Sequence, residues 1–119
     1  MTKYFVSGID TGIGKTFVSA ILTEKLHADY WKPIQSGDLE QSDSKTVASL
    51  ISNKTTFIHP ETYRLTQPIS PHLSARVDGL SIDLAKMTIP ETQNHLIVEG
   101  AGGLMVPLND NDLIIDLIK

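Results

Sequence analysis

The chain of 119 residues contains no cysteine. This absence excludes disulfide bonds, thiolate zinc sites and a cysteine nucleophile, and it fits a cytosolic setting. Positive charge is also scarce, because 10 lysines and arginines stand against 14 acidic residues and give a net charge of −4. Such a balance provides no basic field for a nucleic-acid backbone, so we expect no nucleic-acid partner.

Long apolar runs are missing near the N-terminus. The first apolar stretch, YFV at 4–6, is followed closely by Gly8 and Asp10. It is too short for a secretory signal or a membrane span, so we expect a cytoplasmic protein with no membrane partner. The length suits one domain with a modest core and not two.

Three short apolar segments are predicted to form strands: 3–7 (KYFVS), 29–34 (DYWKPI) and 95–100 (HLIVEG). Each is rich in β-branched or aromatic residues, and the third lacks alternation, as expected of a strand buried on both faces. The Ser-, Thr- and Pro-rich residues 55–72 are predicted to form a loop.

Apolar residues at helical spacing predict a helix over 15–28. A second helix is expected over roughly 44–53, capped by Ser42 or Asp43. Its inward-facing residues are predicted to be Val47, Leu50 and Ile51.

Prolines shape the predicted connections. Pro68 and Pro71 are expected to keep 66–72 extended, and Pro90 to limit any helix over 82–89 to a short one. Another element is predicted to begin within 112–119.

Strands that alternate with helices indicate an α/β fold with a parallel sheet and right-handed crossovers. Ligands of such sheets bind at the carboxyl ends of the strands. Residues 8–16, 32–37 and 99–103 each follow or end a predicted strand. Their convergence on one edge of the sheet indicates a ligand site there.

The segment GIDTGIGKT at 8–16 lies between the first strand and the first helix. The usual phosphate-binding loop, G-x-x-x-x-G-K-[ST], would place its first glycine at position 9, whereas here it is Gly8. Backbone N–H groups and the helix terminus still suit phosphate oxygens. Lys15 is expected to pair with the β- and γ-phosphates, and Thr16 to bind Mg²⁺. The alternative is a glycine-rich turn with a solvated lysine.

Three polar residues could join this loop. Glu99 ends the third strand and is expected to complete a Mg²⁺ shell, directly or through water, although a strand-end glutamate alone is more often solvated. Lys32 points to the same cleft, although a lone lysine there is more often a surface residue. Asp43, taken alone, is a helix cap.

Taken in order, GIDTGIGKT, KPIQSG, the SD pair at 42–43 and VEGAGG resemble the motifs of the dethiobiotin synthetase family. In that family the first motif is similar to G-T-D-T-x-V-G-K-T, which contains the extra loop residue. Thr11 is kept here, whereas Ile9 replaces the family's usual threonine and Gly12 replaces a common glutamate. The segment SPH at 70–72 is also similar to a family segment.

The resemblance implies a P-loop NTPase-type parallel sheet flanked by helices. It implies that residues 1–119 form the N-terminal part of a single ATP-binding carboxylase domain. The implied activity is the ATP- and Mg²⁺-dependent ring closure of 7,8-diaminononanoate with CO₂ to dethiobiotin, with release of ADP and phosphate. One amine takes up CO₂ as a carbamate, ATP phosphorylates the carbamate, and the second amine displaces phosphate.

The resemblance also implies roles for individual residues. Lys32 would stabilise the carbamate and the transferred phosphoryl group, and Lys15 would contact the γ-phosphate; these two are the implied catalytic residues. The implied Mg²⁺ ligands are Thr16, Asp43 and Glu99. The implied substrate-binding residues are Thr11, Lys32 and Ser36. The implied ATP-binding residues are Gly12, Ile13, Gly14, Lys15, Thr16, Phe17, Asp43, Glu99, Gly100, Ala101 and Gly102.

Family members resemble chains of about two hundred residues or more, within the usual range for one domain. We therefore expect this chain to be roughly their first half, either truncated or completed by a second fragment. The other half is expected to bring further strands, adenine-recognition loops and much of a homodimer interface.

Other functions stay open at this point. A related ATP-dependent amidoligase, such as a cobyrinate amidase-type enzyme, shares the loop and the VEGAGG-like signal, although KPIQSG and Thr11 favour a dethiobiotin synthetase. A partitioning-type ATPase resembles K-G-G-x-G-K-T, with a lysine where Asp10 stands here, and the acidic chain disfavours it. The third alternative is an inactive fragment of the fold.

Overall fold

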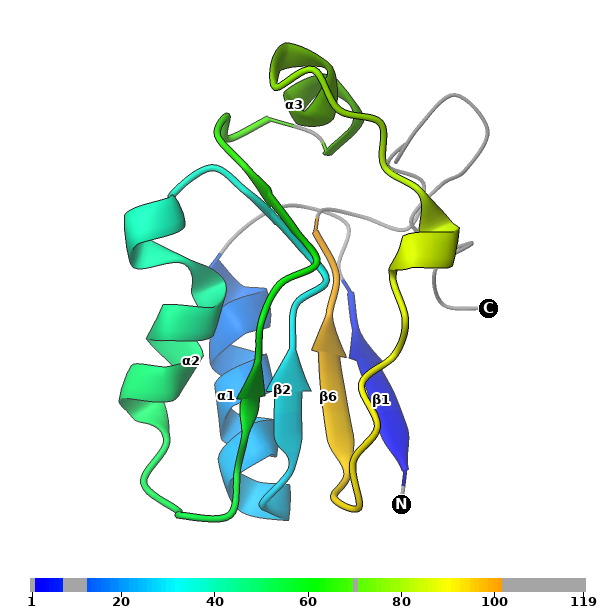
Figure 1. Ribbon diagram of the computed structural model, residues 1–119. Helices are drawn as coiled ribbons and strands as arrows, with labels where there is room; N and C mark the ends of the chain where they lie inside the picture. The colour runs from blue at the N-terminus through cyan, green and yellow to red at the C-terminus, as the bar shows by residue number, and fades with distance from the viewer. Residues whose placement is uncertain (1, 8–12, 70, 102–119) are drawn as a thin grey trace.

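The computed structural model describes residues 2–7, 13–69 and 71–101. Its larger sheet has four strands in the order β1–β6–β2–β4, all paired in parallel. These strands are β1 (Lys3–Val6), β2 (Asp29–Trp31), β4 (Ile58–His59) and β6 (Leu96–Glu99). A smaller parallel sheet pairs β3 (Ile34–Ser36) with β5 (Tyr63–Leu65). The predicted α/β fold is confirmed (Figure 1).

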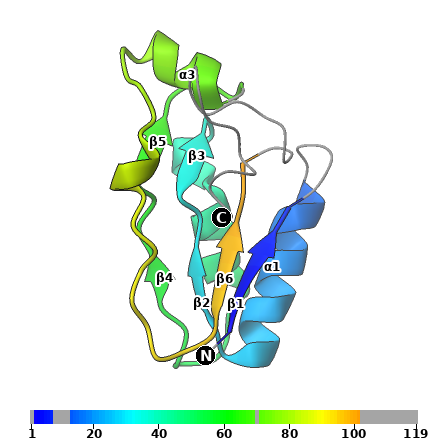
Figure 2. The same ribbon diagram turned by 90° about the vertical axis from the view of Figure 1, so that its right-hand side faces the viewer.

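Helices α1 (Ile13–Leu26) and α2 (Asp43–Leu50) lie side by side along one face of the larger sheet (Figures 1 and 2). Helix α3 (Pro71–Val77) lies beyond the carboxyl ends of the strands, and the chain from α3 to β6 runs across the opposite face. Two short 3₁₀ turns complete the described elements, η1 (Leu39–Gln41) and η2 (Leu84–Lys86). Within the described ranges, no helix has the length and apolarity to cross a membrane.

The side chains of β2 and β6 alternate between the two faces of the sheet, as strand geometry requires. Tyr30 and Ile97 join Val47 of α2 in a buried cluster on the helix side. Trp31 and Val98 belong to a second cluster, which they form with residues of β3, β5 and the segment that crosses the other face. Both strands are thus buried on both faces, which explains their continuous apolar sequences.

The strand predicted over 29–34 is in fact two strands. Lys32 and Pro33 separate β2 from β3, and β3 leaves the larger sheet to pair with β5. Proline has no N–H group to donate to a ladder, which favours a break here. The loop predicted over 55–72 was also wrong in part, because that range contains β4, β5 and the start of α3.

The second helix is shorter than the predicted 44–53 and ends at Leu50. Ser42 is its cap, with Oγ accepting from the backbone N–H of Lys45 at 3.3 Å, and Asp43 is the first helical residue. Val47 is buried as predicted, whereas Leu50 is 47% exposed and does not face inward.

The segment 66–72 is not extended throughout, because α3 begins at Pro71. Proline suits a first helical position, where its missing N–H would have no intrahelical partner. The short helix predicted over 82–89 is the single 3₁₀ turn η2. The element predicted within 112–119 lies outside the described residues.

Helix α1 is confirmed, but its sheet-facing side is not its most apolar side. Its buried residues are Thr16, Ser19, Ala20 and Thr23. Ile21, one of the apolar residues at helical spacing in 15–28, is 62% exposed. Small side chains let the helix approach the sheet closely, and this brings Thr16 to the carboxyl end of β6.

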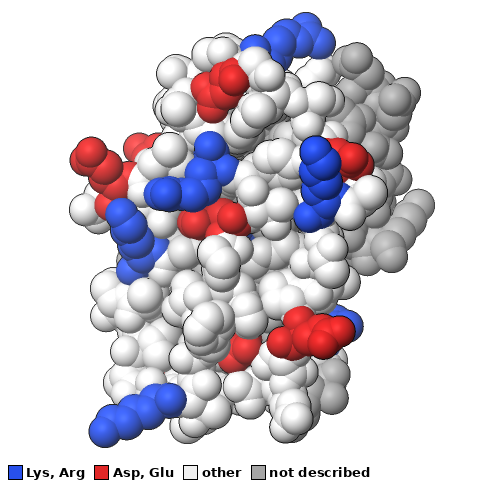
Figure 3. All heavy atoms as spheres, viewed as in Figure 1, with Lys and Arg blue, Asp and Glu red and all other residues white. Residues whose placement is uncertain are grey.

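The charged side chains visible in Figure 3 are mixed in sign. On that face, acidic and basic groups alternate among neutral residues and do not gather into a basic patch. This distribution agrees with the net charge of −4.

Glu24 joins α1 to the turn that follows α2. Its carboxylate accepts from the backbone N–H groups of Ser52 and Asn53, both at 2.9 Å, and from both of their side chains. These bonds, the backbone N–H of Ser52 first, lower the pKa of Glu24 from 4.5 to about 2. Its ionised form is therefore stabilised by folding.

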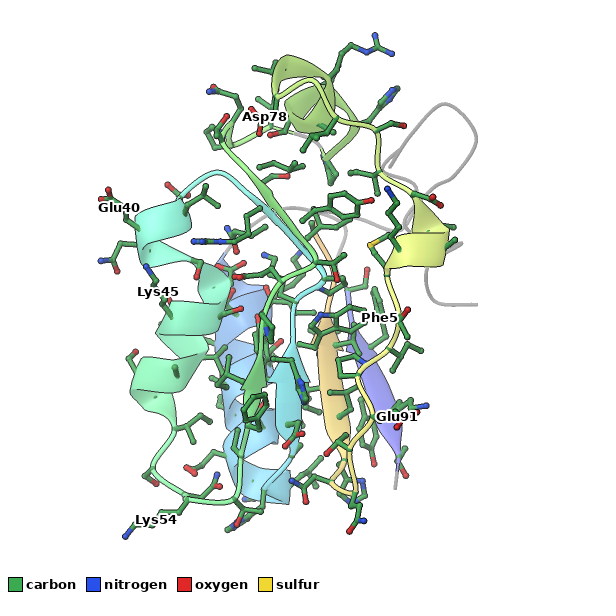
Figure 4. The ribbon with its side chains drawn as sticks, viewed as in Figure 1. Phe5, Glu40, Lys45, Lys54, Asp78 and Glu91 are labelled. Carbon is green, nitrogen blue, oxygen red and sulfur yellow. The ribbon has the colours of Figure 1, made fainter. Side chains whose placement is uncertain are left out.

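We predict that the Glu24 contribution to stability is complete above pH 4.5 and is lost as the pH falls toward 2. The sign follows because the pKa of the folded state is the lower one, so the unfolded chain binds the proton more readily. Glu24→Ala should lower the melting temperature at pH 7. The melting temperature of this variant should also decrease less than that of the wild type as the pH is lowered. Glu40→Ala, at an exposed position labelled in Figure 4, is the control and should do neither. A carboxyl NMR titration of Glu24 with a midpoint near 4.5 would contradict the assignment.

Candidate functional site

The register of β2 and β6 brings Lys32 and Glu99 together. Tyr30 pairs with Ile97, and Trp31 pairs with Val98. Lys32 and Glu99 come next on these neighbouring strands, on the face that looks toward α1. Lys32 Nζ lies 3.6 Å from Glu99 Oε2, and the two side chains are 7% and 1% exposed.

Helix α2 brings a second carboxylate to Lys32. Asp43 Oδ2 accepts a hydrogen bond from Lys32 Nζ and forms an ion pair with it. The buried Gln35 ties this end of the helix to the chain after β3. Its Oε1 accepts from the backbone N–H of Asp43 at 3.1 Å, and its Nε2 donates to the carbonyl of Gly37 at 2.9 Å. Lys32 thus lies between two carboxylates from different elements.

The two oxygens of Glu99 have different partners. Thr16 Oγ1, from the first turn of α1, donates to Oε2 at 3.0 Å. The hydroxyl of Tyr30 donates to Oε1 at 2.8 Å. Thr16 and Tyr30 are both buried, so the carboxylate is held from two sides.

Lys15 connects the start of α1 to the end of β6, because its Nζ donates to the carbonyl of Gly100 at 3.3 Å. Gly100 packs closely against β1. A Cβ there would meet two ring carbons of Phe5, labelled in Figure 4, at 3.0 Å. This close approach favours glycine at the point where the strand leaves the sheet.

The three charges of the cluster shift the pKa values of its carboxyls in opposite directions. Burial raises the pKa of Asp43, but the charge and hydrogen bond of Lys32, together with Glu99 and Thr16, hold that pKa below its usual value. Burial and the charge of Asp43 raise the pKa of Glu99 despite Lys32. A cation placed beside the two carboxylates would favour the ionised form of Glu99.

Tyr30 stays a hydrogen-bond donor in this environment. Burial, followed by the charge of Glu99, raises the pKa of Tyr30 far above its usual range. Its hydroxyl proton is consequently retained at any pH at which the protein would be studied.

The oxygen donors of Thr16, Asp43 and Glu99 fit Mg²⁺, which prefers hard oxygen ligands. Among the described residues, no group of three or more His, Cys, Asp or Glu side chains could hold a metal by itself. Two carboxylates and a hydroxyl suit an ion that keeps several waters or takes phosphate oxygens, as Mg²⁺ does.

The structure thus brings together four of the predicted site residues: Thr16, Lys32, Asp43 and Glu99. Lys15 is tied to Gly100 beside them. On β3, the predicted substrate residue Ser36 has a buried Oγ with no hydrogen-bond partner among the described residues.

The remaining predicted residues are less informative. Phe17 is 44% exposed on α1, and Gly14 has open space where a Cβ would stand. Ile13 begins α1, and Ala101 packs against the cluster on the far side of the sheet. Three predicted positions lie outside the described residues: Thr11, Gly12 and Gly102.

Sequence reasoning missed Tyr30 and Gln35. A signal for Tyr30 was present, because it stands two residues before Lys32 and so shares its face of the chain. Gln35 lies within the KPIQSG segment, but its bond to the backbone of Asp43 depends on how closely α2 approaches β3.

Comparison with known proteins gives a consistent picture. The model of a family described as AAA domain matches residues 2–119. A protein of Cytophaga hutchinsonii named ATP-dependent dethiobiotin synthetase BioD is 55% identical over 99% of this chain and 57% of its own length. Proteins of the same name from Christiangramia forsetii and Agrobacterium fabrum are each 53% identical, over 98% and 97% of this chain. The matches cover 56% and 54% of those two proteins. The chain therefore spans about half the length of the relatives it matches.

We predict that Lys32→Met raises the pKa of Asp43, because the lysine charge is what holds that pKa below 3.8. A carboxyl NMR titration of the two proteins measures the change. Lys45→Met is the matched control, since Lys45 lies on α2, the helix that carries Asp43, and its side chain is exposed (Figure 4). An Asp43 titration that is the same in wild type and Lys32→Met would refute the ion pair.

Proposed function

We propose a function from two facts: the chain belongs to the AAA domain family, and it shares more than half of its aligned residues with proteins named dethiobiotin synthetase. Residues 1–119 form the N-terminal part of a single ATP-binding domain of a dethiobiotin synthetase. The complete enzyme uses ATP and Mg²⁺ to convert 7,8-diaminononanoate and CO₂ to dethiobiotin, ADP and phosphate. The observation that carries the proposal is Lys32, buried between Asp43 and Glu99 beside Thr16.

The cluster suits a reaction between anions. A carbamate oxygen of the carboxylated diamine attacks the γ-phosphorus of ATP, and ADP leaves. The second amine then attacks the carbamoyl carbon and displaces phosphate, with loss of a proton from that nitrogen, to close the cyclic urea. In such a sequence the protein mainly positions the reactants and neutralises charge.

Each residue of the cluster has a proposed part in this reaction. Thr16, Asp43 and Glu99 would hold Mg²⁺, which supplies charge neutralisation on the phosphate oxygens. Lys32, whose ammonium lies beside both carboxylates, would contact the carbamate and the transferred phosphoryl group. Lys15 would contact the γ-phosphate from the first turn of α1.

The other proposed contacts involve residues around the cluster. Ser36 would bind the diamine, and its buried Oγ without a partner among the described residues supports this. Thr11 would lie beside the diamine. ATP would contact the remaining predicted residues of the two loops: Gly12, Ile13, Gly14, Phe17, Gly100, Ala101 and Gly102. We propose that the complete enzyme acts as a cytoplasmic homodimer.

The test of the reaction is isotopic. Protein, Mg²⁺–ATP, 7,8-diaminononanoate and ¹³C-bicarbonate are combined, and the product is analysed by mass spectrometry, with this chain and the natural-length protein run side by side. We expect ¹³C in the cyclic urea made by the natural-length protein. If that protein binds ATP but makes no labelled product, the substrate is wrong and a related amidoligase becomes the better assignment.

We predict that Lys32→Ala in the natural-length protein lowers kcat by at least about 10²-fold, the cost of removing one preorganised donor to developing charge. ATP affinity, measured by calorimetry, should change little, because Lys32 directly follows β2 and is not part of the phosphate loop. Lys45→Ala is the control and should preserve turnover. Equal losses of turnover and ATP affinity would refute this role.

A further inference from the structure

We propose that Tyr30 is a positioning residue that presents Glu99 to the site through one oxygen only and thereby favours Mg²⁺ over Ca²⁺. The inference rests on the proposed function, because it takes Glu99 to be a Mg²⁺ ligand. It concerns a residue that lies outside the motifs on which that function was argued.

The geometry follows from the strand pair. Tyr30 stands opposite Ile97, and Glu99 lies two residues further along β6 on the same face. Two residues of a strand span about 6.6 Å, a distance that a tyrosine side chain covers when it extends along the strand. The hydroxyl therefore reaches the carboxylate of the neighbouring strand, at 2.8 Å from Oε1.

Packing holds Tyr30 in this orientation. The residue is fully buried in the cluster that also contains Ala20 of α1, Val47 of α2 and Ile97. Its ring is thus part of a core that both helices and β6 share. This core packing restricts where the hydroxyl can lie.

Glu99 needs this donor because it is itself almost fully buried. A buried carboxylate oxygen without a hydrogen bond carries a desolvation cost. Without the Tyr30 hydroxyl, Oε1 would therefore be expected to turn toward the donors of Lys32 or Thr16. With Tyr30 in place, Oε1 is engaged and Oε2 alone faces Thr16 and Lys32.

A carboxylate that offers one oxygen discriminates between the two ions. Ca²⁺ accepts 6–8 oxygen ligands and often binds carboxylates through both oxygens, whereas Mg²⁺ requires a compact octahedron. The hydrogen bond from Tyr30 to Oε1 prevents Glu99 from binding a metal through both oxygens. This should lower the affinity for Ca²⁺ more than the affinity for Mg²⁺.

The experiment measures metal affinities in the natural-length protein with a non-hydrolysable ATP analogue. Mg²⁺ and Ca²⁺ each displace Mn²⁺, and free Mn²⁺ is followed by electron paramagnetic resonance. We expect Tyr30→Phe to weaken Mg²⁺ binding by about tenfold, the lower end of the effect of removing a partner of a metal ligand. Ca²⁺ binding should weaken less, so the preference for Mg²⁺ should shrink.

The control is Tyr63→Phe. It removes a tyrosine hydroxyl that accepts from the backbone N–H of Asp83 at 3.0 Å and does not contact Lys32, Asp43 or Glu99. It should leave both affinities unchanged. An equal loss of both metals in Tyr30→Phe, or no loss, would overturn the inference while leaving the proposed function intact. A wild-type protein that binds neither Mn²⁺ nor Mg²⁺ with the nucleotide would overturn both.

A second measurement is made on the wild-type protein and does not depend on the folding of Tyr30→Phe. Infrared difference spectra of wild-type protein with ¹³C-labelled glutamate carboxyls are recorded with and without Mg²⁺, and Glu99→Gln identifies the Glu99 bands. We expect the separation of its two carboxylate stretches to widen, as binding through one oxygen requires. A narrower separation would show binding through both oxygens and refute the role of Tyr30.

Discussion

The parallel pairing of β2 with β6 is the constraint on which the site depends. It sets Tyr30 opposite Ile97 and carries Lys32 and Glu99 to the same edge on the same face. A shift of one residue would turn Lys32 toward the apolar cluster on the other side of the sheet. The register is itself protected by that apolar packing, because both faces of both strands are buried.

The charges at this edge are not explained by stability. Moving an ion from water into a protein interior costs on the order of several kcal/mol, even after the protein relaxes. The attraction within an ion pair does not always offset that cost. Here one lysine serves two carboxylates, and burial, together with the charge of Asp43, raises the pKa of Glu99. The burial of such an unbalanced cluster at the carboxyl end of a parallel sheet is better explained by a ligand that completes its charge.

The elements around the cluster contribute through size and shape. The buried side of α1 consists of small residues, so the helix lies close enough for Thr16 to reach Glu99. Gln35 joins the chain after β3 to the start of α2 and keeps Asp43 near Lys32. Tyr30, which lies outside the predicted motifs, donates to the carboxylate of Glu99, whereas Gln35, within KPIQSG, accepts from the backbone N–H of Asp43.

The sequence by itself determined the α/β class, the three main strands, the first helix and the edge at which the site forms. These follow from local patterns: short apolar runs, helical spacing and a Gly-Lys-Thr segment between strand and helix. Residue type and position after a strand also pointed to Thr16 and Glu99, whereas Lys32 and Asp43 were singled out by the resemblance to dethiobiotin synthetases.

Only the tertiary structure decided how those residues meet. The separate pairing of β3 with β5 and the contacts of Lys32 with Asp43 and Glu99 depend on partners distant in sequence. The same holds for Tyr30, whose type and position fit a core residue equally well. Its contact with Glu99 arises from strand register and helix packing, which local patterns do not specify.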